Sequence, residues 1–492
     1  MKKKYVRWTL WTIASPFILF IILCILIYLP PIQNFLVDKA AVYASEATGM
    51  NISVGRISLS FPLNLVVTNV DAASPHNDTL LSVRRLQVNV QLLPLLKKQV
   101  EVDGISLQGA TVNSNDLIHG MKLNGTLGEL FISSHGVALD PETAIVNKVL
   151  LKDTDLSLCL NDTAAADTAA SDTTYWKIIL QDIDLQNVSF ALDMPLDSLS
   201  LAASLDNAIL RDGLIDLHKS AYSLQTFRIE NGRVRYDNGK PLAADSLSSG
   251  LDPSHIALTD IGVKLDSLYY GGRNMKAIIS QFVLKERSGV EIVSATGRMV
   301  SNDKVLRVPS LKLETRDSYL ELNAAMDWNA LDFKDEGLVS ARLMADIGKP
   351  DVVRFMGSMD EKFIRQYPSE PLRIRTGIDG DLNKLKLTTL TAELPGALGL
   401  FARGELIHLT DSLLRGGDIT LEAETKDLKF VSTLAEGIEI PYGTRLEGKF
   451  TMAGTKMGTD LLLMQPEAQA VVAADTIPIT VYNDSISVAD DF

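Results

Sequence analysis

Cysteine and histidine are scarce in this sequence, and their placement excludes several kinds of site. The only cysteines are Cys24 and Cys159, and Cys24 lies within an apolar run. Neither a disulfide framework nor a cysteine-based metal site can be built from this pair. The six histidines are scattered, without an HExxH motif or a close pair. We therefore expect no bound metal and no cofactor.

Motifs for phosphate binding and for nucleophilic hydrolysis are also missing. No P-loop, GxGxxG or GxSxG segment occurs in the chain. Basic residues are in the minority, with 47 Lys and Arg against 61 Asp and Glu and a net charge of −14. This balance argues against binding to a phosphate backbone, so we expect no nucleic-acid partner. The 46% of hydrophobic residues excludes a disordered chain.

Three pairs of closely spaced carboxylates remain as candidates for catalysis. They are Asp153 and Asp155, Asp182 and Asp184, and Asp379 and Asp381. Paired acids can bind a metal or exchange protons with a substrate. The same spacing is typical of the polar side of a strand or turn, and no histidine or serine constellation accompanies any pair. We predict that the protein is not an enzyme.

One long apolar run lies near the N-terminus. Residues 8–29 carry no charge, and a helix of this length measures roughly 33 Å, enough to cross a hydrocarbon layer of about 30 Å. Three lysines and Arg7 precede the run, so the positive-inside rule places residues 1–7 in the cytoplasm. The aromatic residues of this predicted membrane anchor are Trp8, Trp11, Phe17, Phe20 and Tyr28.

A cleaved signal peptide is the alternative interpretation of this run. Its apolar segment would span about 7–15 residues and end at a small-residue cleavage site. Here the run is longer, and Pro30 and Pro31 follow it. We therefore predict an uncleaved, single-pass signal anchor, with the bulk of the chain outside the cytoplasm. A short amphipathic helix is expected over residues 30–50, ended by Gly49.

From residue 51 onward the dominant hydrophobic period is two. Residues 86–92 alternate without a fault, and residues 320–328, 372–376 and 419–424 do so with little interruption. Alternation places apolar side chains on one face of a sheet, which predicts one-sided antiparallel strands. At roughly 13 residues per strand and turn, such a chain would contain some thirty strands. Few short helices are expected, the best candidate being residues 351–367.

Two further features organise the strand-rich region. A pattern of apolar residues with spacing 2, 3 and 2 recurs at 105–112, 149–156, 183–190 and 227–234, which we interpret as a family of related hairpins. Residues 163–174 are of low complexity and predict a loop. This loop lies between a first β region, residues 51–162, and a second, residues 175–492.

The apolar positions of the alternating segments could line a groove. On alternation alone, the closed cores of ordinary β-sandwiches are the favoured interpretation of these residues. The groove candidates are Leu86, Val88, Val90, Leu92, Ile105, Leu107, Leu320, Leu322, Met326, Ile374, Ile419 and Leu421.

The order of segments in roughly the first 115 residues carries a family resemblance. The apolar run and short helix are followed by residues 49–57, a strand pair ending at 67–70, residues 78–83, and residues 86–112. This order resembles the AsmA-like family, and most closely the N-terminal region of its TamB (translocation and assembly module) branch in bacteria with two membranes. The resemblance implies a long, curled antiparallel sheet with an apolar groove, anchored in the inner membrane and extending into the periplasm.

The resemblance also implies a function in cell-envelope and outer-membrane biogenesis. Family members are linked to the movement of phospholipids between membranes, which favours the open groove over closed cores. TamB proteins are linked to the assembly and secretion of outer-membrane β-barrel proteins, and strand pairing at a sheet edge is the alternative function that we consider. Residues 175–492 show no stretch like the C-terminal domain of TamB proteins, so a barrel partner in the outer membrane is the less secure expectation.

Overall fold

The computed structural model describes most of the strand-rich region. No helix in the described part of the chain is both long and apolar enough to cross a membrane. The predicted anchor over residues 8–29, with Trp8, Trp11, Phe17, Phe20 and Tyr28, lies outside that part. The described residues are 39, 41–42, 45–46, 48–60, 64–74, 78–90, 102–114, 120–138, 142–161, 175–239, 250–332, 337–356, 361–433, 442–464, 479–482 and 485–488.

Most of the described residues belong to β-strands of one long sheet. This confirms the prediction of a mainly β protein with few helices. The chain divides into two compact units, which are described separately below. Unit 1 comprises residues 1–218 and 235–239, and unit 2 comprises residues 219–234 and 240–492.

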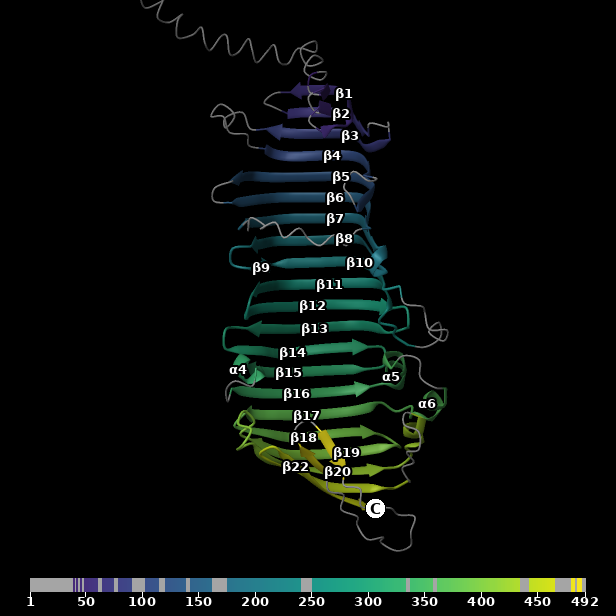
Figure 1. The fold of residues 1–492 in the computed structure, drawn as a ribbon, viewed down its shortest axis with the longest axis vertical. Helices are drawn as coiled ribbons and strands as arrows, with labels where there is room; N and C mark the ends of the chain where they lie inside the picture. Colours follow the sequence, from purple (N-terminus) through teal and green to yellow (C-terminus); the bar gives the residue numbers. More distant parts are fainter. Residues whose placement is uncertain are drawn as a thin grey trace, which may run out of the picture. The chain divides into compact units, whose positions relative to one another are not determined.

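Unit 1 consists of eight strands that pair in chain order (Figure 1). A helical segment precedes them, since the described residues between Lys39 and Thr48 are helical. Gly49 ends this helix, as predicted, with a left-handed φ of 69° and its N–H bonded to the Ser45 carbonyl at 2.9 Å. The strands are β1 (Asn51–Ser60), β2 (Asn64–Ala73), β3 (Thr79–Val90), β4 (Val102–Asn113), β5 (Met121–Ala138), β6 (Thr143–Leu160), β7 (Lys177–Met194) and β8 (Leu199–Asp216).

The pairing of β6 with β7 departs from the antiparallel prediction. Thr143 lies opposite Lys177 and Cys159 lies opposite Asp193, so the two strands run in the same direction. Parallel neighbours need a crossover connection, because the chain must return to the end where the first strand began. That connection contains the low-complexity residues 163–174, which lie outside the described residues. Alternation predicts the faces of a strand but not its direction, which explains the error.

Unit 2 continues with antiparallel strands, and each strand from β11 to β22 pairs with its successor. The strands are β9 (Ala221–Leu224), β10 (Thr226–Asp237, which ends in unit 1), β11 (His255–Gly271), β12 (Asn274–Glu286), β13 (Glu291–Ser301), β14 (Val305–Thr315), β15 (Tyr319–Asp327), β16 (Leu338–Ile347), β17 (Leu372–Asp381), β18 (Lys384–Leu394), β19 (Leu398–Ile407), β20 (Gly416–Thr425), β21 (Arg445–Ala453), β22 (Lys456–Met464), β23 (Ile479–Tyr482) and β24 (Ser485–Val488).

The described residues contain 24 strands, fewer than the thirty that the sequence suggested. The reason is that several strands are far longer than the five or six residues that are typical of globular proteins. Strands β5, β6, β7 and β8 have 18 residues each, and β11 has 17. The same length of chain therefore forms fewer strands, each with room for several apolar residues on one face.

After β1, the helices of the described chain are short and lie at the ends of strands. They are η1 (Pro195–Asp197), α4 (Trp328–Leu331), α5 (Lys349–Phe355), α6 (Glu361–Gln366) and η2 (Lys429–Thr433). The single helix predicted over residues 351–367 is instead the pair α5 and α6. Within unit 2, α4 lies beside one end of the strands, and α5 and α6 lie beside the other (Figure 1).

Two buried clusters distinguish these two rims of unit 2. At the α5 and α6 end, which we call the capped rim, Phe363, Tyr367 and Phe430 pack with ring centroids 5.1–5.8 Å apart. At the other end, which we call the α4 rim, Ala330, Val339 and Leu382 form a smaller cluster with Leu409 packed against it. Both clusters lie at hairpin turns, so they close strand ends.

A line of bends crosses the strands of unit 1. Asn69 on β2, Gly109 on β4, Asp153 on β6 and Asn187 on β7 all have left-handed backbone, with φ between 49° and 61°. In each register both neighbouring strands skip one residue at this point, so their offset is unchanged and these are not β-bulges. A left-handed residue turns an extended strand, because its φ differs in sign from that of ordinary strand residues. The aligned left-handed residues therefore mark a crease that crosses the sheet along one line.

The left-handed residues explain the recurring sequence pattern. In each occurrence the three-residue spacing brackets two residues, such as Gln108 and Gly109, or Gln186 and Asn187, and the second is the left-handed residue. Each pattern lies within a single strand, so the prediction of hairpins was wrong. The left-handed residue interrupts the alternation, and the apolar residues after it continue in rows with their neighbours at an unchanged offset.

Substitutions at Asn187 test whether the crease depends on left-handed backbone. Asn187→Val and Asn187→Gly both remove the 2.9 Å hydrogen bond from Asn187 Nδ2 to Asp153 Oδ1. Only valine is strained at positive φ, so Asn187→Val should lower the free energy of unfolding by about 1 kcal/mol more than Asn187→Gly. Urea unfolding midpoints measure the difference. Equal midpoints would mean that the bend tolerates ordinary backbone.

Candidate functional site

The strongest candidate site in unit 1 is an apolar face formed by side chains that lie opposite one another across the strands. Residues in register share a face, so consecutive pairs form rows that cross the sheet. Two adjacent rows contain only apolar residues through all eight strands. One row is Ile57, Val67, Leu86, Leu107, Leu130, Leu151, Leu185 and Ala208, and the other is Leu59, Leu65, Val88, Ile105, Ile132, Val149, Ile183 and Leu210.

The same arrangement occurs independently in unit 2. One row is apolar through all twelve strands from β11 to β22, and its neighbour differs only by two glycines and Thr376. Large and small side chains are interspersed along the row. The members of the first row are Val263, Phe282, Ala295, Leu313, Leu320, Ala345, Ile374, Ala392, Leu400, Ala423, Leu446 and Leu463.

The opposite face of each unit is polar. In unit 1 a row of polar and charged residues runs beside the apolar ones, on the other side of the sheet. In unit 2 cross-strand ion pairs occupy this face, including Arg375 with Asp346 at 2.7 Å and Lys449 with Asp418 at 2.6 Å. The unit 1 row is Arg56, Thr68, Arg85, Gln108, Glu129, Lys152, Gln186 and Asn207.

Most side chains of the apolar face remain half-exposed. In the two rows of unit 1 only Val67 and Ala208 are buried, and in the first row of unit 2, from Val263 to Leu446, the buried members are the alanines Ala295 and Ala345. Ile105 retains 36% of its accessible surface. Core leucines and isoleucines of a closed β-sandwich would be largely buried. The face therefore has the exposure of an open apolar surface and not that of a closed core.

Burial on this face concentrates beside the crease. The row next to the left-handed residues includes Val83, Ala110 and Thr154, which are 5%, 9% and 2% exposed. The buried Thr154 hydroxyl donates to the Lys152 carbonyl of its own strand at 3.2 Å, so it adds no unpaired polar group. The other members of this row are half-buried. These three buried positions, which we call the floor, lie beside the half-exposed rows of the apolar face of unit 1.

The structure places the sequence-predicted candidates together on these faces. Leu86, Val88, Val90, Ile105 and Leu107 lie on the apolar face of unit 1, and their six counterparts from Leu320 to Leu421 lie on that of unit 2. Leu92 lies outside the described residues. Sequence analysis missed the alanines and Thr154 as site residues because small and hydroxyl side chains blur alternation, and it missed Phe282 because register shifts flank this residue on β12. For Thr154 the three-residue spacing was the signal that could have identified it.

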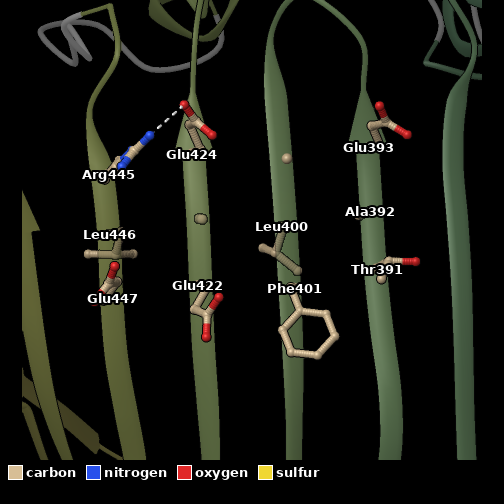
Figure 2. Close-up of a pocket in the computed structure, with 12 residues that line it drawn as sticks. Thr391, Ala392, Glu393, Leu400, Phe401, Glu422, Glu424, Arg445, Leu446 and Glu447 are labelled. Atoms are coloured by element: carbon tan, nitrogen blue, oxygen red, sulfur yellow. Dashed lines mark hydrogen bonds and ion pairs between the residues drawn. The ribbon is translucent and has the colours of Figure 1, made fainter.

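A hollow of about 470 Å³ lies over strands β18 to β21 (Figure 2). Most of its lining lies on the polar face, in two rows that cross these strands. One row is Thr391, Phe401, Glu422 and Glu447, and the other is Glu393, Gly399, Glu424 and Arg445. Glu424 pairs with Arg445 at 3.4 Å, whereas Glu422 and Glu447 are exposed and lie directly opposite each other. The lining residues include no histidine, cysteine or serine. The hollow is therefore not part of the apolar face.

Each of the three carboxylate pairs includes at least one residue with a structural partner. Asp182 and Asp184 both bind Arg211, the latter at 2.8 Å from Nη2. Asp381 accepts hydrogen bonds from the backbone N–H groups of Asn383 at 3.0 Å and Lys384 at 2.7 Å, which closes the turn between β17 and β18. The first pair includes Asp153, one of the residues of the crease. In the described part of the chain no group of three potential ligands could hold a metal ion.

Side chains with a shifted pKa lie away from the apolar face. The Tyr319 hydroxyl donates to Glu321 Oε2 at 2.9 Å on the polar face, and this carboxylate raises the pKa of the tyrosine. The ion pair with Asp260 at 2.7 Å raises the pKa of Lys285. Burial in the capped rim raises the pKa of Tyr367. All three shifts favour the ordinary protonation state at neutral pH. The hydrogen bond with His255 lowers the pKa of Asp252, which likewise favours the ordinary ionised carboxylate.

Comparisons with known proteins add no assignment. No protein-family model matches the sequence, and no curated protein matches it.

Matched leucine substitutions test whether the apolar face is open. Leu322 is half-exposed on the face, whereas Leu394 is 4% exposed in the capped rim. Leu394→Ala should lower the free energy of unfolding by about 2–5 kcal/mol, the usual cost of a cavity in a core. Leu322→Ala should cost only about 1 kcal/mol, because much of its surface already contacts water. Urea denaturation compares the two, and similar losses would indicate a closed core.

Proposed function

We propose that the apolar face binds the acyl chains of phospholipids and provides a path along which they move between membranes. The observation that carries this proposal is the set of uninterrupted apolar rows, two in unit 1 and one in unit 2, whose large side chains stay half-exposed. A face of this kind offers contacts that are generic for hydrocarbon chains. It requires no catalytic residue, in agreement with the structural roles of the carboxylate pairs.

Energetics favour an acyl chain as the occupant. A phospholipid with two acyl chains exposes about thirty CH₂ groups, and at about 0.8 kcal/mol each their transfer through water costs roughly 24 kcal/mol. A continuous apolar row lowers this barrier at every step, because a chain can leave one leucine while it contacts the next. Interspersed alanines such as Ala345 and Ala392 leave space between the larger side chains for hydrocarbon.

Location is part of the same proposal. The apolar run over residues 8–29 would hold the N-terminus in the inner membrane, and the sheet would extend into the periplasm, in agreement with the resemblance to the AsmA-like family. Phospholipids would then enter from the inner membrane during envelope biogenesis. Assembly of outer-membrane β-barrel proteins by strand pairing is the alternative function.

Photo-crosslinking at neighbouring residues tests the proposal. Leu322 and Glu321 are adjacent on β15, but their side chains lie on opposite faces. With a benzophenone amino acid at either position in cells, phospholipid adducts should form at Leu322 and not at Glu321. Mass spectrometry of the purified protein detects the added lipid. Leu107 and Gln108 on β4 provide the equivalent pair in unit 1.

Two outcomes would contradict the lipid proposal. Equal labelling at both residues of a pair would show non-specific contact with lipid. An absence of phospholipid adducts at Leu322 and Leu107, in variants that still fold, would overturn the proposal. Adducts to barrel proteins would then favour the strand-pairing function.

A further inference from the structure

Two adjacent leucines are held outward at the tip of the connection between β19 and β20. Leu413 is 82% exposed and Leu414 is 63% exposed. The backbone N–H groups of both residues donate to Asp411 Oδ1, at 2.8 and 3.2 Å, and the N–H of Arg415 donates to the Asp411 carbonyl at 2.8 Å. The turn is therefore built to present these side chains.

The base of this tip is fixed on the α4 rim of unit 2. Arg415 Nε donates to the Gly454 carbonyl at 2.8 Å, and the Gly454 N–H donates back to the Arg415 carbonyl at 2.7 Å, which joins the turn between β21 and β22. On the other side, Leu409 packs against the buried cluster that contains Leu382 of the turn between β17 and β18. Antiparallel hairpins place alternate turns at the same end of a sheet, so these turns share one rim.

Aromatic side chains continue along the same rim. Arg273, in the turn between β11 and β12, lies over the Trp328 ring at 5.6 Å from its centroid. Tyr222 and Tyr270 stack with their centroids 6.2 Å apart and are 40% and 46% exposed. Tyrosine and tryptophan join an apolar ring to a polar tip, which suits them to the boundary between hydrocarbon and water.

The carboxylates of this rim form ion pairs and hydrogen bonds with other groups of the rim. Asp332 pairs with Arg273 at 3.2 Å, and Asp411 and Asp381 accept backbone N–H groups within their turns. Beside the leucine tip, Lys456 is exposed. The rim therefore presents leucines, aromatic rings and cationic groups, the combination that binds the interface of a bilayer.

We propose that the α4 rim of unit 2 contacts a lipid surface, with Leu413 and Leu414 entering the acyl boundary and Trp328, Tyr222 and Tyr270 lying at headgroup level. The apolar groups are separate points along successive hairpin turns, whereas a stable protein partner needs a continuous patch of about 800 Å². A bilayer plane accepts such separate points. The inference rests on the proposed function, because a rim against a lipid surface is where lipids would join or leave the apolar face.

A fluorescent label at the tip tests the contact. In the full chain with Cys24→Ser and Cys159→Ser, an environment-sensitive NBD label is attached through Leu413→Cys or through the control Leu196→Cys. Leu196 lies in η1 of unit 1 and is 64% exposed, similar to Leu414. In phosphatidylcholine and phosphatidylglycerol vesicles, the label at 413 should shift to the blue and be quenched by nitroxide lipids. The label at 196 should be quenched by aqueous iodide.

Two results would overturn the inference. The first is equal iodide quenching at both positions. The second is protection of the label at 413 from iodide that increases with protein concentration, without quenching by nitroxide lipids. This result would show contact between copies of the chain. The cross-linking pair Leu322 and Glu321 keeps the two proposals separate. Adducts at Leu322 without lipid contact at 413 would leave the proposed function intact, and the reverse would leave a membrane-binding rim without a lipid path.

Discussion

The apolar face depends on the register between each strand and the next. Because side chains alternate, a slip of one residue would move all the apolar residues of a strand to the polar face. In most sheets the burial of one face specifies the register, but here that face is only half-buried. Register must therefore be specified from the other side of the sheet.

In each unit an arginine on the polar face contributes to this specification at one strand pair. Arg211 on β8 binds Asp184 of β7 at 2.8 Å and donates to the Ile183 and Leu210 carbonyls. In unit 2, Arg375 on β17 repeats the arrangement with Asp346 of β16 and the Ala345 and Ile374 carbonyls. A guanidinium has several donors in a fixed plane, so one side chain can fix the offset of two strands. These strand pairs therefore keep their register without tight packing between side chains on the apolar face.

The sequence predicts those parts of the structure that depend on the local alternation of apolar and polar residues. Period two identified the strands around Leu86, Leu320 and Ile374 and the face on which their side chains lie, because alternation is a local property. Strand direction is not local, so the parallel β6 and β7 pair was missed. The crease was visible only as a three-residue spacing, and its meaning depends on the left-handed φ of residues such as Asn187. The α4 rim was missed because its parts, from Tyr222 to Leu414, meet only through the hairpin topology.

Because the apolar face is half-exposed, the stability of the fold depends on what occupies this face. Each leucine left partly in water forfeits some of the roughly 1.5–3 kcal/mol that full burial contributes. The fold compensates with long ladders of backbone hydrogen bonds, with the buried clusters at the rims, and with the floor around Thr154. On the proposed function, an acyl chain seated on the face completes the core, and a ligand that binds only the folded state stabilises it further. The same leucines then contribute both to the stability of the fold and to the binding of the acyl chain. When the acyl chain has moved on along the rows, the stability of each segment returns to its earlier value.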